Sequence, residues 1–483
     1  MPHSHATANR RACLSLRSSF LLVAGLMSGC AHFQSRPLSA ATAARAFEGR
    51  SLADAGLHAF LSENHVPPPP GGRWDLTALT LAAVYYQPAL AEARAQLRAA
   101  QAAQITAGQR PNPSISLTPA HDAVPGTPSP WIVPLALDWP IETAGKRGYR
   151  MAQAHELASA ARWNLIGTVW AVRGRVRTAL LDLYAARQRE SLLARQVSAE
   201  RKVVRLLQGQ FAAGSVSSYI VEQARVTLNT TILAQQAASG QLRQARVQLA
   251  GALGVPPRAL RHVRLSFQDF SRFPLRLTQP QVRRQALLSR ADVLAALADY
   301  AASQSALQLQ IAMQYPDIQL GPGYAWNSQL AGDSSWSLGL GLTLPILNRN
   351  QGPIAEARAR RRLAAARFLS VQASALGEID SALAAYDSAR QRLATANSLM
   401  AGLKTQLGSI QAQAQAGELQ PLDMANAEIA FDVGSQNQLE AQLEAQQSLG
   451  LLEQAVQSPL TLAPVTLHAP QPPAPRNQDP TIQ

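Results

Sequence analysis

The sequence repeats one pattern twice, and this duplication constrains the fold more than any other feature. A glycine-centred turn interrupts a long helical segment at Gly214, within QFAAGSVSSYIVEQARVTL, and another interrupts a second segment at Gly417, within QAQAGELQPLDMANAEI. The two glycines lie 203 positions apart, and Pro140 and Pro345 lie 205 positions apart. Offsets this constant over the body of the chain indicate two copies of one structural unit.

Each copy contains two short segments that are typical of strands and that we expect to form a hairpin. The first pair covers 115–118 and 131–139, and the second covers 317–326 and 335–344. In the last segment, WSLGLGLTL alternates leucines with serine, glycine and threonine, so a strand there has one apolar face and one small-residue face. This alternation suits a wall between lipid and water. A strand buried in a soluble sandwich is the alternative.

Long helical segments follow both predicted hairpins. As an α-helix, the segment from about 148 to 210 would be about 90 Å long. In the second copy, apolar residues recur in two heptad series, which are Ile379, Tyr386, Leu393, Met400, Leu407 and Ala382, Ala389, Ala396, Leu403, Ile410. The first copy has similar series, interrupted by Glu190 and Glu200. The pattern predicts helices packed side by side along heptad seams, with an ordinary antiparallel helical hairpin as the alternative.

The N-terminus has the features of an export signal. Three arginines precede the apolar run 20–26, and this run leads into LMSGC, which ends at Cys30 and resembles a bacterial lipobox. We therefore expect lipidation at Cys30, with an ordinary signal peptide as the alternative. Residue 31 is alanine rather than aspartate, which by analogy with lipoprotein sorting favours the outer membrane. No other apolar run approaches the length of a membrane-spanning helix, so strands must cross the membrane if the mature chain does.

The repeat and the signal divide the chain into six segments. In order, we expect a lipoprotein signal peptide over 1–29, a lipid-anchored arm over 30–75, a first repeat over 76–257, a linker over 258–277, a second repeat over 278–457 and a proline-rich tail over 458–483. The arm ends in four prolines and two glycines, which predict a stiff, extended linker. Pro88 predicts a break in the first helix, and Thr278 is a plausible N-cap of a later one.

Composition and charge exclude several classes of function. Hydrophobic residues make up 47% of the chain but aromatic residues only 5%, which is typical of long helices. The formal net charge is +14, yet the arginines are spread singly along the helices, so we expect no nucleic-acid partner. The sequence has no nucleophile motif, phosphate-binding loop or ligand-spaced metal cluster, and we predict neither an enzyme nor a bound cofactor.

Together, these features resemble the TolC-type outer-membrane efflux channels over residues 76 to 457. The resemblance implies a mainly α-helical chain with membrane β-strands, three copies of which form a twelve-stranded outer-membrane β-barrel continuous with a long periplasmic α-helical barrel. It implies passive conduction of substrates as the exit duct of a tripartite efflux system. The implied partners are two further subunits, a periplasmic adaptor protein, an inner-membrane RND-type pump and outer-membrane lipid.

Two motifs that follow the predicted strand hairpins resemble one subgroup of these channels. PIETAGKR at 140–147 and LPILNRNQGPIAEA at 344–357 resemble the CzcC-like channels of heavy-metal cation efflux. Metal cations are therefore the expected cargo, with multidrug efflux or type I secretion by the same fold as alternatives. The residues give no independent sign of a metal, because the nine histidines are scattered and the six methionines do not cluster. We predict no metal site.

The resemblance also assigns roles at the helical turns. The residues expected to contact the adaptor are Gly214, Ser217, Ser218, Ala224, Gly417, Pro421 and Ala427. In related channels an acidic residue six positions after the second tip glycine lines the narrow entrance, and here that residue is Asp423, the candidate gate. A solvated or capping role near a helix start is the alternative for Asp423. The first copy has Ile220 at this position, and Asn426 stands where a second acidic ring can occur.

Two other classes of protein share some of these features. A periplasmic adaptor is also exported and built around a helical hairpin, but it would have one hairpin flanked by lipoyl-like and β-barrel segments. A structural coiled-coil lipoprotein of the envelope would have no use for the alternating WSLGLGLTL segment. The two strand pairs and two helical hairpins therefore favour the channel.

Overall fold

The computed structural model describes residues 33–66, 72–121, 131–274, 279–327 and 334–460. The predicted signal peptide, Cys30, Thr278 and all but the first three residues of the C-terminal tail lie outside these residues. The chain divides into two compact units, 1–49 and 50–483. In the first unit, helix α2 covers Ala40–Glu48 and has no buried residue. Everything that follows concerns the second unit.

The second unit begins with a short helix within the segment that was expected to form an arm, while the predicted extended linker lies almost wholly outside the described residues. Helix α3, Ala55–Glu63, starts at Asp54, whose carboxylate accepts a hydrogen bond from the Leu57 amide at 2.9 Å. Leu57, Phe60 and Leu61 are buried together. The helix forms because an N-cap aspartate and apolar residues at helical spacing make an amphipathic turn that packs into the core.

The predicted break at Pro88 is confirmed. Helix α4 covers Leu76–Tyr86, helix α5 covers Pro88–Gly108, and Gln87 separates them in an extended conformation. Pro88 is the first residue of α5, where its missing N–H needs no partner. The Gln87 side chain donates hydrogen bonds to the carbonyls of Gly251 and Ala252. These bonds attach the break to the C-terminal end of the helix Ser218–Leu253.

Both predicted strand pairs are present and join into one antiparallel sheet. Its strands are β2 (Ser114–Leu117), β4 (Trp131–Ile141), β6 (Ile318–Asn327) and β7 (Ser334–Leu342), in the order β2-β4-β6-β7, and the short β3 (Ala120–His121) also pairs with β4. The contact between β4 and β6 joins the two repeats. Elsewhere, β1 (Arg73–Trp74) pairs in parallel with β5 (Arg264–Leu265).

The register gives the sheet two chemically different faces. Ile115 pairs with Leu137, and three further pairs place apolar side chains on the same face, which are Leu135 with Tyr324, Leu320 with Leu340 and Ile318 with Leu342. The opposite face pairs Ser116 with Ala136 and Gly321 with Gly339. Every residue of β7 is exposed. Within the described residues, β2 and β7 each pair on one side only, so the sheet has two open edges.

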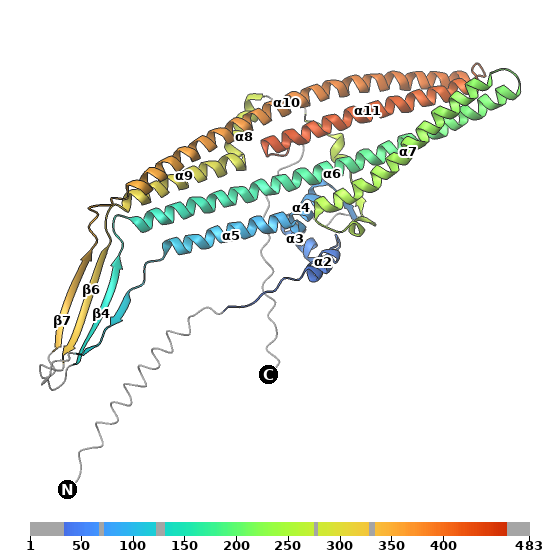
Figure 1. Cartoon of the computed structure of the whole chain (residues 1–483). Coiled ribbons are helices and arrows are strands. Elements are labelled where there is room, and N and C mark those ends of the chain that lie inside the picture. Colours follow the sequence, from blue (N-terminus) through green and yellow to red (C-terminus); the bar gives the residue numbers. More distant parts are fainter. Residues whose placement is uncertain (1–32, 67–71, 122–130, 275–278, 328–333, 461–483) are drawn as a thin grey trace, which may run out of the picture. The chain divides into compact units, whose positions relative to one another are not determined.

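Two long helical hairpins form most of the second unit. The first is α6 (Lys146–Ala212) with α7 (Ser218–Leu253), and the second is α10 (Gln351–Gln415) with α11 (Pro421–Val456). Helices α6 and α10 contain 67 and 65 residues, which confirms the predicted rods. Figure 1 shows the sheet at one end of these helices and both helical turns at the other. None of the described helices meets the length and apolarity needed to span a membrane.

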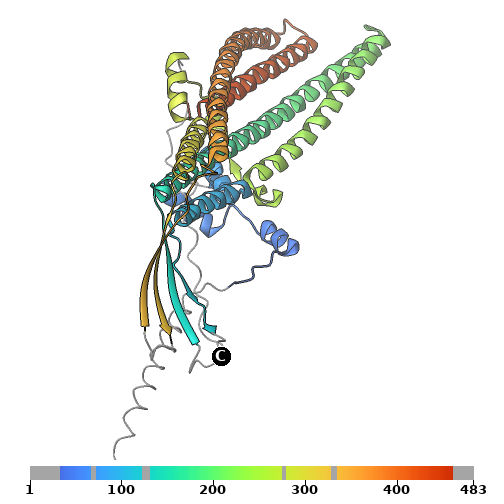
Figure 2. The ribbon, with the colours of Figure 1, turned by 60° about the vertical axis from the view of Figure 1, so that its left-hand side comes forward.

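Shorter helices lie beside the rods. Helix α9, Ala291–Ala312, packs against α6 and α10, and α5 packs against α6 (Figure 2). Helix α8, Gln279–Ser289, precedes α9. Two short 3-10 helices, η2 (Pro257–Leu260) and η3 (Gln268–Ser271), lie in the linker between the repeats. The same arrangement of a short helix, a strand pair and a helical hairpin thus occurs twice.

The core follows the predicted heptad seams. In the second copy Ile379, Tyr386 and Met400 are buried, together with Ala382 and Ala389. In the first copy the larger core includes Val172, Val176, Leu180 and Leu183 of α6, which pack with residues of α3, α4, α7 and α11. Glu200 occupies a position of the first-copy seam and is also buried, so the predicted interruption is a charged group inside the helix packing.

A buried polar network joins the two repeats within this core. The guanidinium group of Arg177 on α6 donates to the Gln446 carbonyl at 2.7 Å, and Gln446 on α11 donates to the Phe270 carbonyl at 2.9 Å. Glu453 is buried beside it and pairs with Arg173 at 2.9 Å. Burial lowers the pKa of Arg177, while Glu453 opposes that shift. Because these groups come from both repeats and the linker, they fix the register between the hairpins.

Candidate functional site at the helix tips

The two helical turns have the same backbone structure. In the first, the amide of Ser215 bonds the Gln210 carbonyl at 2.8 Å and that of Gly214 bonds the Phe211 carbonyl at 2.9 Å. In the second, Glu418 bonds Gln413 at 3.0 Å, and Gly417 bonds Ala414 at 3.2 Å. This is the Schellman arrangement that ends a helix at a left-handed residue. Gly214 and Gly417 have φ angles of 75° and 81°, which glycine adopts without strain.

The helices that leave the two turns start differently. Ser217 is the N-cap of α7, and its side chain makes no capping hydrogen bond. Gln420 is the N-cap of α11, and its amide donates to the carboxylate of Asp423 at 3.2 Å, while the Gln420 side chain accepts from the Asp423 amide. This reciprocal capping box satisfies two helix-end donors. Asp423 is therefore an exposed capping residue. Its predicted role as a gate stays a prediction.

The predicted docking residues are not equally accessible. Ser217, Ser218 and Pro421 are exposed at the tips, whereas Ala224 and Ala427 are partly buried one to two turns along α7 and α11. Apolar side chains are also exposed at the first tip, namely Phe211, Tyr219 and Ile220, of which sequence reasoning gave Phe211 no role. Tyr219 has 73% of its surface exposed. Tyr219 is the last residue of the turn 214–219 that was expected to contact an adaptor.

Below the tips, polar contacts connect α6 of the first hairpin to α11 of the second. Lys202 pairs with Glu428 at 3.0 Å, and Arg195 pairs with Asp432 at 3.1 Å. Beside the second pair, the Gln436 amide donates to the Gln196 side chain at 2.8 Å. The sequence could not reveal these contacts, because they depend on which faces of the two hairpins meet. They join the two hairpins along α6 and α11.

The two motifs next to the sheet have structural roles. Lys146 is buried and donates to the Tyr315 carbonyl at 2.6 Å and to the Asp317 carboxylate at 2.7 Å. In the other motif, Asn350 has a left-handed φ of 60° and donates to the Gln310 carbonyl at 2.7 Å. Each motif is thus held to a neighbouring segment by hydrogen bonds, and neither motif contributes a residue to the tips.

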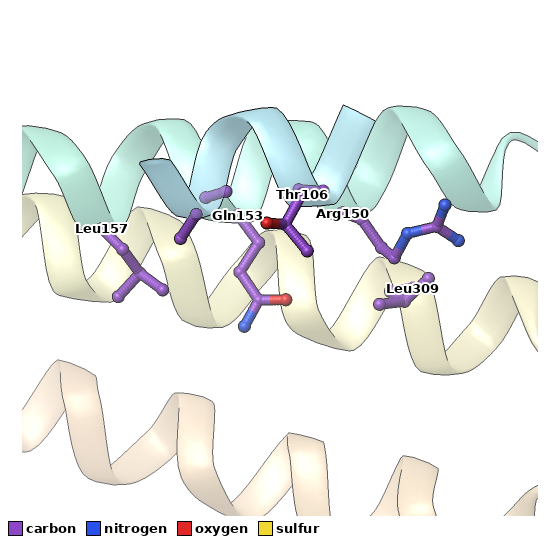
Figure 3. Close-up of a pocket in the computed structure, with 8 residues that line it drawn as sticks. Thr106, Arg150, Gln153, Leu157 and Leu309 are labelled. Atoms are coloured by element: carbon purple, nitrogen blue, oxygen red, sulfur yellow. The ribbon is translucent and has the colours of Figure 1, made fainter. Parts of the chain in front are cut away.

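A shallow cavity of about 370 Å³ lies where α5, α6 and α9 meet near the sheet. Figure 3 shows Thr106, Arg150 and Leu309 around it, together with Gln153 and Leu157. Arg150 is ion-paired with Glu142, and its neighbours are largely apolar. Among the residues that the structure describes, no group of three or more histidine, cysteine or acidic side chains could hold a metal ion.

The arrangement of sheet, rods and tips occurs in solved outer-membrane proteins. The chain is similar to CusC with a TM-score of 0.63, 19% identity and coverage of 79% of this chain and 91% of that one. VceC from Vibrio cholerae gives a TM-score of 0.64 at 19% identity, covering 79% and 96%. The open MtrE channel of Neisseria gonorrhoeae gives 0.65 at 16% identity, covering 82% and 91%. These similarities define the fold as that of TolC-like outer-membrane channels.

The sequence itself assigns the family. The outer membrane efflux protein model matches residues 83–255 and 282–456, one match for each repeat. The chain therefore belongs to the outer membrane efflux protein family. A comparison with curated proteins gives no match.

Proposed function

We propose that three copies of the chain form an outer-membrane channel that serves as the exit duct of a tripartite efflux system. The observation that carries this proposal is the sheet, which has one apolar face and, among the described residues, two open edges. Open edges are costly in lipid because their backbone groups lack hydrogen-bond partners, and an exposed apolar face is costly in water. Four strands from each of three subunits close a twelve-stranded barrel, which removes the edges and turns the apolar face to lipid.

The rods supply the periplasmic part of the duct. Helices of 67 and 65 residues reach about 100 Å at 1.5 Å per residue, far more than a globular core requires. Their tips present Gly214 and Gly417 in open space, since an added Cβ at either would meet nothing within 4 Å. We assign adaptor docking to these turns, with Ser217, Ser218 and Pro421 at the contact and Ala224 and Ala427 behind it.

Asp423 is the proposed gate residue. In a trimer, three copies of this exposed carboxylate lie at equivalent places close behind the second tips, where a ring of like charge attracts cations. The capping box holds the side chain at the start of α11, so its position follows the helix whenever the tip moves. The first copy offers Ile220 instead, so the two turns contribute differently to the entrance.

Heavy-metal cations are the proposed cargo, supported by the two joint motifs and by the acidic entrance. The motifs at 140–147 and 344–357 resemble those of CzcC-like channels, and this likeness is the reason for preferring metals over drugs or secreted proteins as cargo. Energy and primary selectivity come from an adaptor and an inner-membrane pump. The mature chain is proposed to be lipidated at Cys30 and to extend from the outer membrane into the periplasm.

Two experiments test these assignments. Heat-sensitive trimers of the full chain in the outer-membrane fraction are expected, and a monomer confined to the periplasm would exclude the channel. For the cargo, deletion of the gene is expected to sensitise cells to zinc, cobalt, cadmium, copper or silver while leaving resistance to dyes and antibiotics unchanged. The reverse pattern would assign the channel to drugs.

Docking is tested with bulky residues at the tips. Gly214→Trp and Gly417→Trp are expected to abolish export while trimers persist, because the large side chain occupies space reserved for the adaptor. Gly209→Trp is a matched control, since Gly209 lies on α6 one turn before the tip and also has open space around it. Normal export by both tip variants would contradict docking at these turns.

A further inference from the structure

Helix α7 carries uncovered apolar side chains along the side that faces away from α6. Val226, Leu233 and Val247 recur at multiples of seven residues and have 65%, 67% and 54% of their surface exposed. Thr231, on the opposite side of α7, is buried and donates to Glu200 of α6 at 3.0 Å. Heptad spacing is typical of a helix seam, so these residues indicate a second seam on α7 that no described part of the same chain covers.

Toward the tips, the long helices form an open layer of four (Figure 1). Helix α7 packs on α6, α6 packs on α11, and α11 packs on α10, so α7 and α10 are the two ends of the layer. The sheet likewise ends in the two different strands β2 and β7. A closed ring of identical subunits joins one end of each copy to the other end of the next. In the proposed trimer, α7 of one copy therefore lies beside α10 of its neighbour.

The exposed side of α10 matches the seam on α7 in level and in size. Counted from the tip glycines, Leu233 and Ser398 are both 19 residues away, and Gly240 and Gln391 are both 26 residues away. The pairs at 12 and 33 residues are Val226 with Thr405 and Val247 with Ala384. All four of these α10 residues are exposed. Each large apolar side chain thus faces a smaller one, and the glycine faces the longest side chain, as close helix packing requires.

One arginine and one aspartate lie on the same two faces at the same level. Arg243 is 29 residues from its tip glycine, Asp387 is 30 residues from the other, and both side chains are exposed. The guanidinium group of Arg243 lies over Gly240, where an added Cβ would be 4.0 Å from its Nη2 atom. Asp387 is four residues before Gln391, on the same face of α10. Neither charge has an ion-pair partner in the part of the chain that the structure describes.

The other charges of these two stretches do not oppose this pairing. Three ion pairs are made within the subunit, which are Glu222 with Arg225, Asp380 with Arg283 and Arg392 with Glu444. Each of the remaining three, Arg246, Arg390 and Lys404, directly precedes a residue of the matched pairs and so lies about 100° round the helix from it.

We propose that α7 of one copy packs against α10 of the next, with Leu233 against Ser398 at the centre and Arg243 paired with Asp387. The inference rests on the proposed trimer and identifies the surface through which its periplasmic part closes. A second copy fits better than an adaptor, because the match extends over about 30 Å of helix and keeps both tips of the chain level.

The test is disulfide formation between copies of the full-length chain. Leu233→Cys with an affinity tag and Ser398→Cys without one are co-expressed, so that a disulfide joins the two chains only across the contact. After mild oxidation and heating, we expect a mixed dimer that reductant converts to monomers. Each variant expressed alone controls for the natural Cys13 and Cys30. Gln391→Cys in place of Ser398→Cys is the matched control, because one heptad moves the thiol by about 10 Å, beyond the reach of a disulfide.

Charge reversal is a second test that does not depend on the geometry of a disulfide. Arg243→Asp and Asp387→Arg should each lower the temperature at which trimers dissociate, because each places two like charges in contact. The variant that carries both changes should regain the wild-type dissociation temperature. Failure of the double change to restore that temperature would remove this ion pair from the contact.

The outcomes separate the contact from the channel itself. The mixed dimer of Leu233→Cys and Ser398→Cys, without one in the Gln391→Cys control, supports the contact. Heat-sensitive trimers that never form this disulfide overturn it and assign the apolar side of α7 to another partner, such as the adaptor. A wild-type chain that stays monomeric would contradict the proposed channel instead.

Discussion

Glu200 on α6 accepts a hydrogen bond from Thr231 on α7 at 3.0 Å, at the place where the second copy packs Leu403 against Gly434. Both pairs are related by the offset of 203 positions that relates the tip glycines. At Gly434 an added Cβ would overlap the Leu403 side chain, so the glycine provides the space for that leucine. Equivalent positions of the two helical hairpins are thus occupied by a polar pair in the first copy and by an apolar pair in the second.

Glu200→Leu is expected to stabilise the chain. The second carboxylate oxygen of Glu200 is buried without a hydrogen-bond partner, and Thr231 keeps a second bond to the Thr227 carbonyl at 3.3 Å. Replacing a buried charge by an apolar residue should raise the free energy of unfolding by about 1 kcal/mol. The reciprocal Leu403→Glu should lower it by about 3 kcal/mol. Thermal unfolding in detergent measures both, and a loss of stability in Glu200→Leu would contradict this view of the pair.

Gly214→Ala and Gly417→Ala are expected to destabilise the turns equally. Neither site is crowded, so the cost is that of a left-handed residue with a Cβ, about 1 kcal/mol. The controls are Gly209→Ala and Gly408→Ala, which lie inside α6 and α10 with open space around them. These should gain up to about 1 kcal/mol from helix propensity. Thermal unfolding should show a lower free energy of unfolding for the tip variants and a higher one for the controls. Changes of equal sign would mean that the φ angles do not decide the effect on stability.

Asp423→Asn and Asp423→Ala separate the gate from the cap. Asparagine keeps an oxygen that can accept from the Gln420 amide but removes the charge, whereas alanine removes both. If the charge serves the gate, both variants reduce cation selectivity or raise leak in planar bilayers. The alanine variant should in addition lose about 1 kcal/mol of stability with the capping box. Wild-type conductance and selectivity in Asp423→Asn would remove the charge from the gate.

Stability should respond to pH in opposite directions at two aspartates. Burial would raise the pKa of Asp292, but its hydrogen bonds and ion pair with Arg290 outweigh burial and lower the pKa below its ordinary value. Its stabilising effect is therefore complete above about pH 4 and disappears as the pH falls through the lowered pKa. Asp292→Asn should destabilise the chain at pH 7, with a difference that vanishes in acid.

Asp182 provides the control of opposite sign. Burial raises the pKa of this carboxyl group on α6, so its charged form is disfavoured in the folded state. Asp182→Asn should therefore stabilise the chain at pH 7, and the gain should shrink as the pH falls through the raised pKa and then the unfolded value. Melting temperatures between pH 3 and pH 7 measure both variants, and parallel pH profiles would contradict the assignment.

Much of the fold could be predicted because local patterns specify it. The alternation in WSLGLGLTL and the heptads around Ile379 and Tyr386 correspond to the observed β7 and α10 seam. The short helix α3 was missed because its nine residues are too few for a periodic signal to stand out from the proline-rich segment after it.

The candidate site was less predictable, because contacts between distant helices depend on their relative rotation. The turns at Gly214 and Gly417 were found from the repeat alone, and their left-handed φ angles agree with that prediction. The capping box of Asp423 was weighed only as an alternative, although Gln420 three residues earlier is consistent with it. The pairs Arg195 with Asp432 and Lys202 with Glu428 had no signal in the sequence.

The most direct test of the channel is the conductance of purified trimers in planar lipid bilayers. The proposal predicts discrete current steps from heat-sensitive trimers, with a preference for cations that decreases when Asp423 is replaced by asparagine. Heated, monomeric protein at the same concentration should give no steps. An intact trimer that binds to the bilayer without passing current, both as wild type and with the α6–α11 ion pairs removed by Arg195→Ala/Lys202→Ala, would contradict the central claim that this chain is a channel.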